Sequence, residues 1–161
     1  MDGNQEIKAN INELLSSTLI ILRSNLKHVV DVDVDLAENL PDINCQPGKL
    51  NQVFMNIITN AAHATIDTDL KRSERSVKVI TRVVKTDDSE VIQVKISDNG
   101  VGMSKDTQAQ IFIPFFTTKD VGKGTGLGLS IVQGILEDHN AEVEISSEIG
   151  EGTMFILSFP T

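Results

Sequence analysis

The sequence lacks the features that mark secreted and membrane-spanning proteins. Its one cysteine, Cys45, excludes an intramolecular disulfide and fits a reducing compartment. No window approaches the roughly 18–20 consecutive apolar residues that a membrane span needs. The first residues show no basic region followed by an apolar core, as a signal peptide would. We therefore expect a cytoplasmic chain that makes no membrane contact of its own, although a longer parent protein could be anchored to a membrane.

Basic residues are also scarce. The chain carries 14 Lys and Arg against 23 Asp and Glu, which gives a formal net charge of −9. A nucleic acid needs a dense basic surface, so we do not expect one as the main partner. A nucleotide is not excluded, because a few backbone amides and one metal ion can hold its phosphates.

Helix and strand patterns alternate along the chain, which at 161 residues suits a single domain. Residues 1–10 are expected to be frayed, which leaves 11–161 as the domain. Apolar residues at helical spacing predict three helices, over 11–26, 49–67 and 127–138. Alternating and β-branched residues predict five strands, over 30–36, 77–84, 91–97, 142–147 and 153–159. This order predicts an α+β fold, a two-layer α/β sandwich whose mixed, mostly antiparallel sheet carries helices on one face.

Three aspartates alternate with valines in the first predicted strand. The spacing of Asp31, Asp33 and Asp35 could suggest a metal site. Neighbours two apart on a strand diverge from a common centre unless the strand bends. A strand face turned to solvent is therefore the favoured interpretation.

Glycine is concentrated in one stretch, since six of the eleven glycines lie between residues 98 and 128. A long glycine-rich segment in a small domain is usually functional. Two familiar phosphate motifs fail here. A P-loop needs Ser or Thr after its Gly–Lys pair, but Gly124 follows Lys123. A dinucleotide fingerprint needs a glycine where the chain has Leu127.

The first glycine pair directly follows a predicted strand, in the segment 98–102. A carboxylate fixed at a strand end, Asp98, can accept a hydrogen bond from an exocyclic amine. Gly100 and Gly102 allow the backbone to pass flat against a planar ring. This arrangement suits adenine, whose amine donates, and not guanine, whose oxygen at that position accepts. An ordinary Asx turn is the alternative.

Two asparagines lie one turn apart on the second predicted helix. Asn56 and Asn60 share a face among apolar neighbours, so both amides are expected near the boundary of the core. A buried amide needs partners, and a neutral side-chain oxygen can bind Mg²⁺ together with phosphates and waters. A structural role for both amides is the alternative. His63, about one turn beyond Asn60, could face either phosphates or solvent.

The second glycine run leads straight into the last predicted helix. It comprises Gly122, Lys123, Gly124, Thr125, Gly126, Leu127, Gly128 and Leu129. Free backbone amides at a helix start favour anions. The run therefore predicts an anion site, with a flexible hinge as the alternative.

Together these segments closely resemble the ATP-binding catalytic domain of sensor histidine kinases, in the wider family that includes gyrase, mismatch-repair ATPases and heat-shock chaperones. The matching segments are an asparagine box at 52–61, glycine boxes at 98–102 and 124–129, a phenylalanine box at 111–119 and a glycine turn at 150–153. Each could arise by chance, whereas all of them in this order are highly specific. The resemblance spans most of the chain and implies a Bergerat-type ATP-binding fold.

The resemblance also implies roles for single residues. ATP and Mg²⁺ are the implied cofactors, with Asn60 as the metal ligand and Asp98 as the acceptor for the adenine amine. Gly100 and Gly102 would shape the adenine pocket, and residues 103–125 would form an ATP lid. Further implied nucleotide contacts are His63, Lys123, Gly124, Thr125, Gly126, Leu127, Gly128, Leu129 and Thr153. The implied catalytic positions are Asn56, Asn60 and Lys119, with Lys119 approaching the phosphate tail.

Two departures sharpen the implied activity. ATP-hydrolysing relatives carry a Glu one turn before the metal asparagine, where this chain has Asn56, which cannot act as a general base. Hydrolysis should therefore be poor, and transfer of the γ-phosphate to a positioned acceptor fits better. None of the three histidines is followed by the acidic residue typical of a phosphoacceptor. The chain is interpreted as the catalytic part of a two-component sensor histidine kinase, inactive in autophosphorylation without its phosphoacceptor domain.

The implied partner is the helical phosphoacceptor domain of the same kinase and, through it, a response regulator. We expect the fragment to be monomeric and the parent homodimeric, because the family dimerises through the missing helices. Phe112, Phe115 and Phe116 cluster in the predicted lid, where they could dock those helices or pack on their own domain. The rival functions are a non-catalytic nucleotide-binding scaffold and an ATPase clamp, and Asn56 argues against the clamp.

Overall fold

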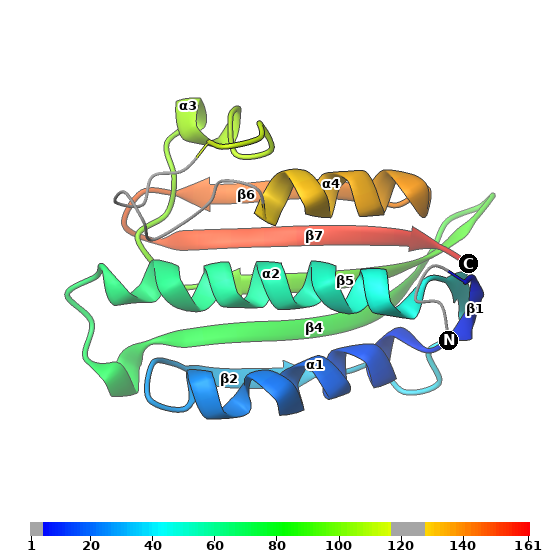
Figure 1. Cartoon of the computed structure of the whole chain (residues 1–161), viewed down its shortest axis with the longest axis horizontal. Helices are drawn as coiled ribbons and strands as arrows, with labels where there is room; N and C mark the ends of the chain where they lie inside the picture. Colours follow the sequence, from blue (N-terminus) through cyan, green and yellow to red (C-terminus); the bar gives the residue numbers. More distant parts are fainter. Residues whose placement is uncertain (1–4, 117–127) are drawn as a thin grey trace.

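Three long helices cover one face of a five-stranded sheet in a computed structural model, which describes residues 5–116 and 128–161 (Figure 1). The helices are α1 (Ile11–Leu26), α2 (Pro47–Ile66), α3 (Lys105–Gln108) and α4 (Gly128–Asp138), with a 3-10 turn η1 at Arg72–Glu74. The strands are β1 (Ile7–Ala9), β2 (Asp31–Asp35), β3 (Ile43–Cys45), β4 (Ser76–Lys85), β5 (Glu90–Asp98), β6 (Glu142–Glu148) and β7 (Gly152–Pro160). Within these described ranges, no helix combines the length and apolarity needed to cross a membrane.

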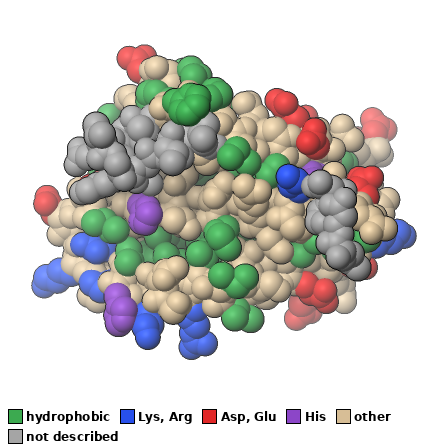
Figure 2. Space-filling model, in the orientation of Figure 1, with side chains coloured by type: hydrophobic (Ala, Val, Ile, Leu, Met, Phe, Trp, Pro, Cys, Tyr) green, Lys and Arg blue, Asp and Glu red, His purple; other side chains and the backbone are tan. Residues whose placement is uncertain are grey.

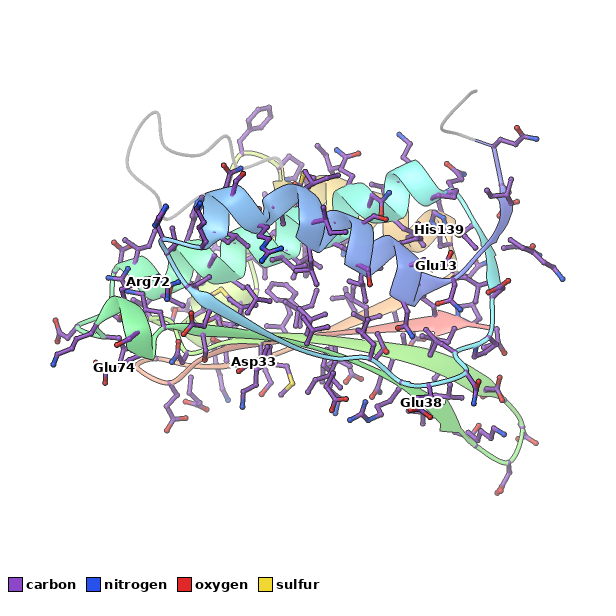
Figure 3. All side chains as sticks on the ribbon, turned by 90° about the horizontal axis from the view of Figure 1, so that it is seen from below. Glu13, Asp33, Glu38, Arg72, Glu74 and His139 are labelled. Carbon is purple, nitrogen blue, oxygen red and sulfur yellow. The ribbon has the colours of Figure 1, made fainter. Side chains whose placement is uncertain are left out.

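The sheet has the strand order β2-β4-β5-β7-β6. β2 runs parallel to β4, and the three other neighbouring pairs are antiparallel. Figure 3 shows the helices on one side of the sheet and Asp33 on the other. The predicted fold class, a mixed and mostly antiparallel sheet with helices on one face, is confirmed.

The core lies between the helices and the sheet, because each element turns an apolar side inward. Phe54 and Ile57 of α2 are fully buried, as are Ile92 and Ile96 at alternate positions of β5. Phe54 meets Phe159 of β7 edge-on, with ring centroids 6.3 Å apart. Burying such a side chain contributes about 1.5–3 kcal/mol. The core therefore holds α2 across the centre of the sheet and sets the position of its polar residues.

Regular structure begins closer to the N-terminus than predicted, at Ile7. β1 pairs antiparallel with β3, and Asn10 caps α1 by accepting a hydrogen bond of 3.0 Å from the backbone N–H of Asn12. The prediction of frayed residues 1–10 is therefore wrong for 7–10. β1 and β3 have three residues each and are separated in the sequence by α1 and β2. Strands this short leave no periodic signal in the sequence. Cys45, at the end of β3, is fully buried, and burial raises the pKa of its thiol.

The three aspartates of β2 are exposed. Asp31 forms an ion pair with Arg72 at 3.1 Å, and Asp35 forms one with Arg82 at 2.7 Å. Among the residues that the structure describes, no three metal-ligating side chains come together. The solvent-facing interpretation of these carboxylates therefore holds.

Candidate nucleotide-binding site

Helix α2 carries the polar residues singled out by the sequence along one of its faces. Asn56, Asn60 and Ala64 follow at intervals of four, so they share a side of the helix and span about 12 Å along it. The first glycine segment contacts this face at Ala64, and the start of α4 contacts it at Asn56. Asn60 therefore lies between two segments that are far apart in the sequence.

The first glycine segment closes on the C-terminal end of α2. Val101 donates its backbone N–H to the carbonyl oxygen of Ala64 at 3.0 Å. A Cβ on Gly100 would come within 2.5 Å of the same oxygen, so only glycine permits this approach. The contact brings the end of β5, with Asp98, against α2 one turn beyond Asn60.

The second glycine segment reaches the same face of α2 one turn before Asn60. The side-chain Nδ2 of Asn56 donates to the carbonyl oxygen of Gly128 at 3.3 Å. Gly128 is the first residue of α4. A helix start offers unpaired backbone N–H groups and the positive end of the helix dipole to an anion. The start of α4 thus lies beside α2 one turn before Asn60, and the phosphate site predicted there stays a prediction.

Asn60 itself is available for a ligand. Its side chain is half-buried, and its amide makes no hydrogen bond within the part of the chain that the structure describes. A half-buried amide with an uncommitted oxygen suits a hard cation that takes its other ligands from phosphates and water. Asn56 differs, because its amide nitrogen is used to hold α4.

Asp98 ends β5 with a half-buried carboxyl group. Its Oδ1 accepts a hydrogen bond of 2.8 Å from the backbone N–H of Gly100, and the backbone N–H of Thr153 also bonds to the carboxyl. Burial raises the pKa of Asp98 from 3.8 to about 6, although the two hydrogen bonds lower it. A carboxylate with a raised pKa is short of donors, so a ligand that donates a hydrogen bond would stabilise its charged form.

The Asx turn that the sequence left as an alternative is present, since Asp98 accepts from the N–H two residues further on. An ionised carboxylate has about four acceptor positions, so the turn and the site are compatible. Asn99 serves the fold. Its side chain accepts from the backbone N–H of Ser76 at 3.0 Å and donates to the carbonyl oxygen of Glu74 at 2.8 Å.

Two glycines near Asp98 have packing roles that the sequence did not reveal. Gly102 has a φ of +72°, and a Cβ there would lie 1.9 Å from the carbonyl oxygen of Glu148. Gly152 has a φ of +121°, and its Cβ would lie 2.0 Å from the carbonyl oxygen of Asp98. These glycines, like Gly100, let one backbone pass directly over another. The part of Gly100 and Gly102 in shaping an adenine pocket stays a prediction.

The predicted lid begins at an anchor on the sheet. Met103 donates its backbone N–H to the Oγ of Ser147 at 2.8 Å, and that Oγ lies 2.7 Å from the hydroxyl of Thr153. Helix α3 follows, with Ser104 as its cap accepting from the backbone N–H of Thr107 at 3.1 Å. Sequence reasoning missed Ser147, because a serine in an alternating strand looks like any other solvent-facing residue.

Part of the predicted site lies outside the described residues, namely Lys119, Lys123, Gly124, Thr125, Gly126 and Leu127. The lid predicted over 103–125 is therefore described only as far as residue 116. His63 is exposed in the last turn of α2, and Leu129 is half-buried in the first turn of α4.

The three phenylalanines of the predicted lid differ in their surroundings. Phe112 and Phe116 are half-buried and pack against the core. Phe115 is 72% exposed and has a φ of +69°, which is uncommon for a bulky residue. Ile113 beside it is also exposed. Packing on the domain therefore accounts for two of the three rings, and Phe115 with Ile113 forms an exposed apolar tip.

A histidine at the other end of α2 ties that helix to α4. The Nε2 of His139 accepts from the backbone N–H of Gln46 at 3.0 Å, and its Nδ1 lies 2.8 Å from the carbonyl oxygen of Ile135 (Figure 3). Both contacts together require the neutral ring with its proton on Nδ1. Gln46 is the N-cap of α2 and makes no side-chain cap of its own. Sequence reasoning missed this role, because the contact joins residues far apart in the chain.

A model of one protein family, described as histidine kinase-, DNA gyrase B- and HSP90-like ATPase, matches residues 45–161. The match includes the asparagines of α2, both glycine segments and Thr153. The chain belongs to this ATPase family. The predicted resemblance is thus confirmed at the level of the family.

Relatives within this ATPase family include histidine kinases of much greater length. Sporulation kinase E of Bacillus subtilis (strain 168) is 33% identical over 153 residues, covering 94% of this chain and 19% of that protein. The signal transduction histidine-protein kinase AtoS of Escherichia coli (strain K12) is 34% identical over 154 residues, covering 95% of this chain and 24% of that protein. The chain therefore spans about a quarter or less of these two relatives.

Solved structures of the ATPase family have the same fold. The catalytic domain of histidine kinase ThkA, in a nucleotide-free form, matches with a TM-score of 0.80 at 26% identity, covering 97% of this chain and 95% of that chain. Full-length ShkA in complex with AMPPNP matches with a TM-score of 0.79 at 24% identity, covering 97% of this chain and 31% of that chain. The two-layer arrangement is thus that of a histidine kinase catalytic domain.

Proposed function

We propose that this chain binds ATP with Mg²⁺ and supplies the γ-phosphate to a histidine on a separate helical phosphoacceptor domain. Membership of the ATPase family and the match to one domain of longer histidine kinases support this proposal. In the transfer, the bond between the γ-phosphorus and the β–γ bridging oxygen breaks and a bond to an imidazole nitrogen forms. ADP leaves, and the imidazole proton passes to solvent.

The observation that carries the proposal is the placement of both glycine segments on one face of α2. The segment with Asp98 contacts Ala64, the start of α4 contacts Asn56, and Asn60 lies between the two contacts. A hydrogen-bond acceptor at one end and a helix start at the other suit a molecule with a base at one end and phosphates at the other. A nucleoside triphosphate has this form.

The chemistry of Asp98 favours adenine over guanine. An ionised carboxylate accepts hydrogen bonds and donates none. The N6 amine of adenine donates to it, whereas the O6 of guanine would oppose it with another acceptor. The raised pKa of Asp98, caused by burial, supports a site completed by a donor.

The residues present fit Mg²⁺. Asn60 offers a neutral oxygen that makes no hydrogen bond within residues 5–116 and 128–161, beside the helix start proposed for the phosphates. Mg²⁺ prefers oxygen ligands and is commonly held by one or two protein groups together with phosphates and waters. When bound, the ion neutralises charge on the β- and γ-phosphates.

Transfer is favoured over hydrolysis by the residue at position 56. Asn56 cannot accept a proton from water, and its Nδ2 is committed to Gly128. Catalysis then depends on positioning of the acceptor histidine and on charge stabilisation of the phosphoryl group. We further propose that Lys119 and Lys123 provide part of that stabilisation.

The exposed tip of the lid supports docking of a partner. Phe115 and Ile113 are 72% and 52% exposed, so both lack the burial that apolar side chains gain against a surface. We assign this contact to the phosphoacceptor helices of the parent kinase, which we place in the cytoplasm as a homodimer that signals to a response regulator.

Calorimetry with Mg²⁺ and a non-hydrolysable ATP analogue tests the binding half of the proposal. We expect binding of the ATP analogue and at least about tenfold weaker binding of the GTP analogue. Asp98→Asn should weaken binding of the ATP analogue by about tenfold or more, because the amide can offer a donor where an acceptor is needed. Asp87→Asn, in the exposed turn between β4 and β5, is the matched control. Unchanged affinity in the Asp98 variant would overturn the adenine assignment.

Asn60→Ala tests the metal site. The variant should lose most of the difference in affinity between solutions with and without Mg²⁺, and Asn44→Ala, an exposed residue of β3, should keep it. If the affinity of both variants depends equally on Mg²⁺, Asn60 is not a ligand of the metal ion.

Mixing the chain with the phosphoacceptor domain of its parent protein and γ-labelled ATP tests the transfer half. Acid-labile label on the partner histidine is the expected result. Intact nucleotide binding without transfer would favour a nucleotide-binding scaffold. Rapid release of phosphate without the partner would favour an ATPase clamp.

A further inference from the structure

A second surface, outside the proposed nucleotide site, lies between α1 and β2. It is a groove of about 460 Å³, with Leu19, Ile20, Arg23 and Lys27 on one wall and Val32 and Val34 on the other. In Figure 1, α4, α2 and α1 lie side by side on the sheet, and β2 is its edge strand under α1. The nucleotide site lies between α2 and α4, so α1 and part of α2 separate it from this groove. We call it the α1–β2 groove.

The α1–β2 groove exposes aliphatic side chains that the fold does not use. α1 packs into the core through Ile11, Leu15, Leu22 and Leu26. Ile20 is instead 74% exposed, and Val34 across the groove is 47% exposed. Apolar side chains gathered in an exposed hollow mark a surface that another molecule covers.

The rim of the groove is basic in a chain whose net charge is −9. Arg72 is engaged with Asp31 and with the carbonyl oxygen of Lys27. The side chains of Arg23 and Lys27 form no ion pair with any residue in 5–116 or 128–161. Figure 2 shows Lys and Arg side chains gathered at the lower left of the molecule around hydrophobic ones. The positive charge left over at this rim is complementary to carboxylates on a partner.

The shape of the groove suits a helix. Leu19 and Arg23 of α1 and its C-cap Lys27 follow at intervals of four and form a ridge of the kind that packs into the grooves of a neighbouring helix. The other wall is the helix-facing side of the edge strand, with Val32 and Val34. A helix laid here would continue the layer α4-α2-α1 beyond the edge of the sheet. It would bury Ile20 and Val34 and place its flanking residues next to the two cations.

We propose that the α1–β2 groove is a docking site for an acidic amphipathic helix of a partner protein. Such a helix would insert leucine-like residues at helical spacing between Ile20 and Val34. Glutamates or aspartates along its flank would pair with Arg23 and Lys27. The site is independent of nucleotide binding, so either proposal can fail without the other.

Fluorescence anisotropy with synthetic peptides of about five helical turns tests the proposal. The probe carries leucines at positions i, i+3, i+4 and i+7 with glutamates on its flanks, and the comparison peptides are a scrambled version and one with lysines for glutamates. We expect the acidic helix to bind at least about tenfold more tightly than either. Equal binding of the scrambled peptide, or no binding of the acidic helix, would overturn the proposal.

Matched variants locate the contact. Ile20→Ser should weaken peptide binding at least about fivefold, whereas Ile21→Ser, a residue 62% exposed on the same turn but outside the groove, should not. Arg23→Glu with Lys27→Glu should abolish binding, and Lys8→Glu with Lys78→Glu, which change the net charge equally, should leave it. Similar losses in both members of either pair would overturn the proposal. Affinity for the ATP analogue should be unchanged in all four variants.

Two further results would assign the α1–β2 groove to a different occupant. Binding of the wild-type chain to phosphatidylserine vesicles, lost in the Ile20 variant, would assign the groove to a lipid surface. A concentration-dependent dimer in sedimentation that is lost in the same variant would assign it to a second copy of the chain. Peptide binding by a chain that stays monomeric and ignores vesicles supports the helix.

Discussion

Asn56 and Gly128, 72 residues apart in the sequence, are joined by a hydrogen bond of 3.3 Å from the asparagine Nδ2 to the glycine carbonyl oxygen. This contact sets the start of α4 beside α2. A Cβ on Gly128 would still sit 3.9 Å from the Asn56 side chain, so the pair depends on the amide and not on close packing. Asn56 stands where hydrolysing relatives carry a general base, and its side chain also positions the proposed phosphate site.

Asn56→Ala should therefore act at two levels. We expect a loss of about 1 kcal/mol in the free energy of unfolding, because one half-buried hydrogen bond is lost. Affinity for the ATP analogue should also fall, because the α4 start is no longer held. Urea denaturation and calorimetry measure the two effects, with Asn44→Ala as control. A loss of stability with unchanged nucleotide affinity would separate this hydrogen bond from the site.

Asp98 should make the nucleotide-free protein less stable as the pH rises. Its pKa is about 6 in the folded state against 3.8 for an unperturbed carboxyl, so the folded state binds more protons between these values. The stability that it contributes is fully present below pH 3.8 and is lost as the pH rises through about 6. Asp98→Asn should remove this slope and raise the free energy of unfolding at pH 8 by about 1–3 kcal/mol. Unfolding curves from pH 4 to 8 for both proteins check this, and an unchanged slope in the variant contradicts it.

Nucleotide affinity should show the opposite dependence on pH. The adenine amine needs the charged form of Asp98 as acceptor, so affinity should fall as the pH drops below about 6. The phosphates of ATP also titrate in this range, so the comparison is the ratio of affinities between wild type and Asp98→Asn at each pH. That ratio should approach one at pH 5. A ratio independent of pH would mean that Asp98 does not titrate in the free site.

Gly102 and Gly134 offer a matched pair of glycine substitutions. Gly102→Ala should destabilise the fold by more than about 2 kcal/mol, because the positive φ disfavours alanine and a Cβ would meet the Glu148 carbonyl oxygen at 1.9 Å. Gly134→Ala, inside α4 with nothing within 4 Å of its Cβ, should stabilise by about 0.5–1 kcal/mol. Thermal unfolding of the two variants measures both changes in stability. A tolerated alanine at 102 would show that the segment after β5 can move away from Glu148 at little cost.

His139 should contribute to stability through the N-terminus of α2. His139→Ala leaves the backbone N–H of Gln46 without its acceptor, so we expect a loss of about 1–2 kcal/mol. His28→Ala, an exposed histidine between α1 and β2, should change stability by less than about 0.5 kcal/mol. Chemical denaturation at pH 8 compares the two, and equal effects would deny His139 a capping role.

Local signals in the sequence predicted most of the elements. The apolar spacing of α1, α2 and α4 and the alternation of β5 and β7 are properties of neighbouring residues, so a single sequence shows them. The order of the motifs was also enough to indicate the ATPase family, which the family model confirmed. Strands β1 and β3 were missed, because three-residue strands exist only through their pairing with each other.

For the candidate site, too, the sequence supplied one part of the description and the tertiary structure the other. The sequence by itself determined which residues are proposed to carry the chemistry: an acceptor at Asp98, an amide at Asn60 and a helix start after Gly126. Only the tertiary structure decided what surrounds Asp98 and Asn60, because burial, close backbone approaches and hydrogen bonds between distant segments depend on the packed chain. Packing brought the Asn99 side chain into a hydrogen bond with Ser76 at the start of β4. It also made Gly100 and Gly102 points of close backbone contact and raised the pKa of Asp98. It also left Ile20 beside two cations at the edge of the sheet, which no periodicity in α1 could show.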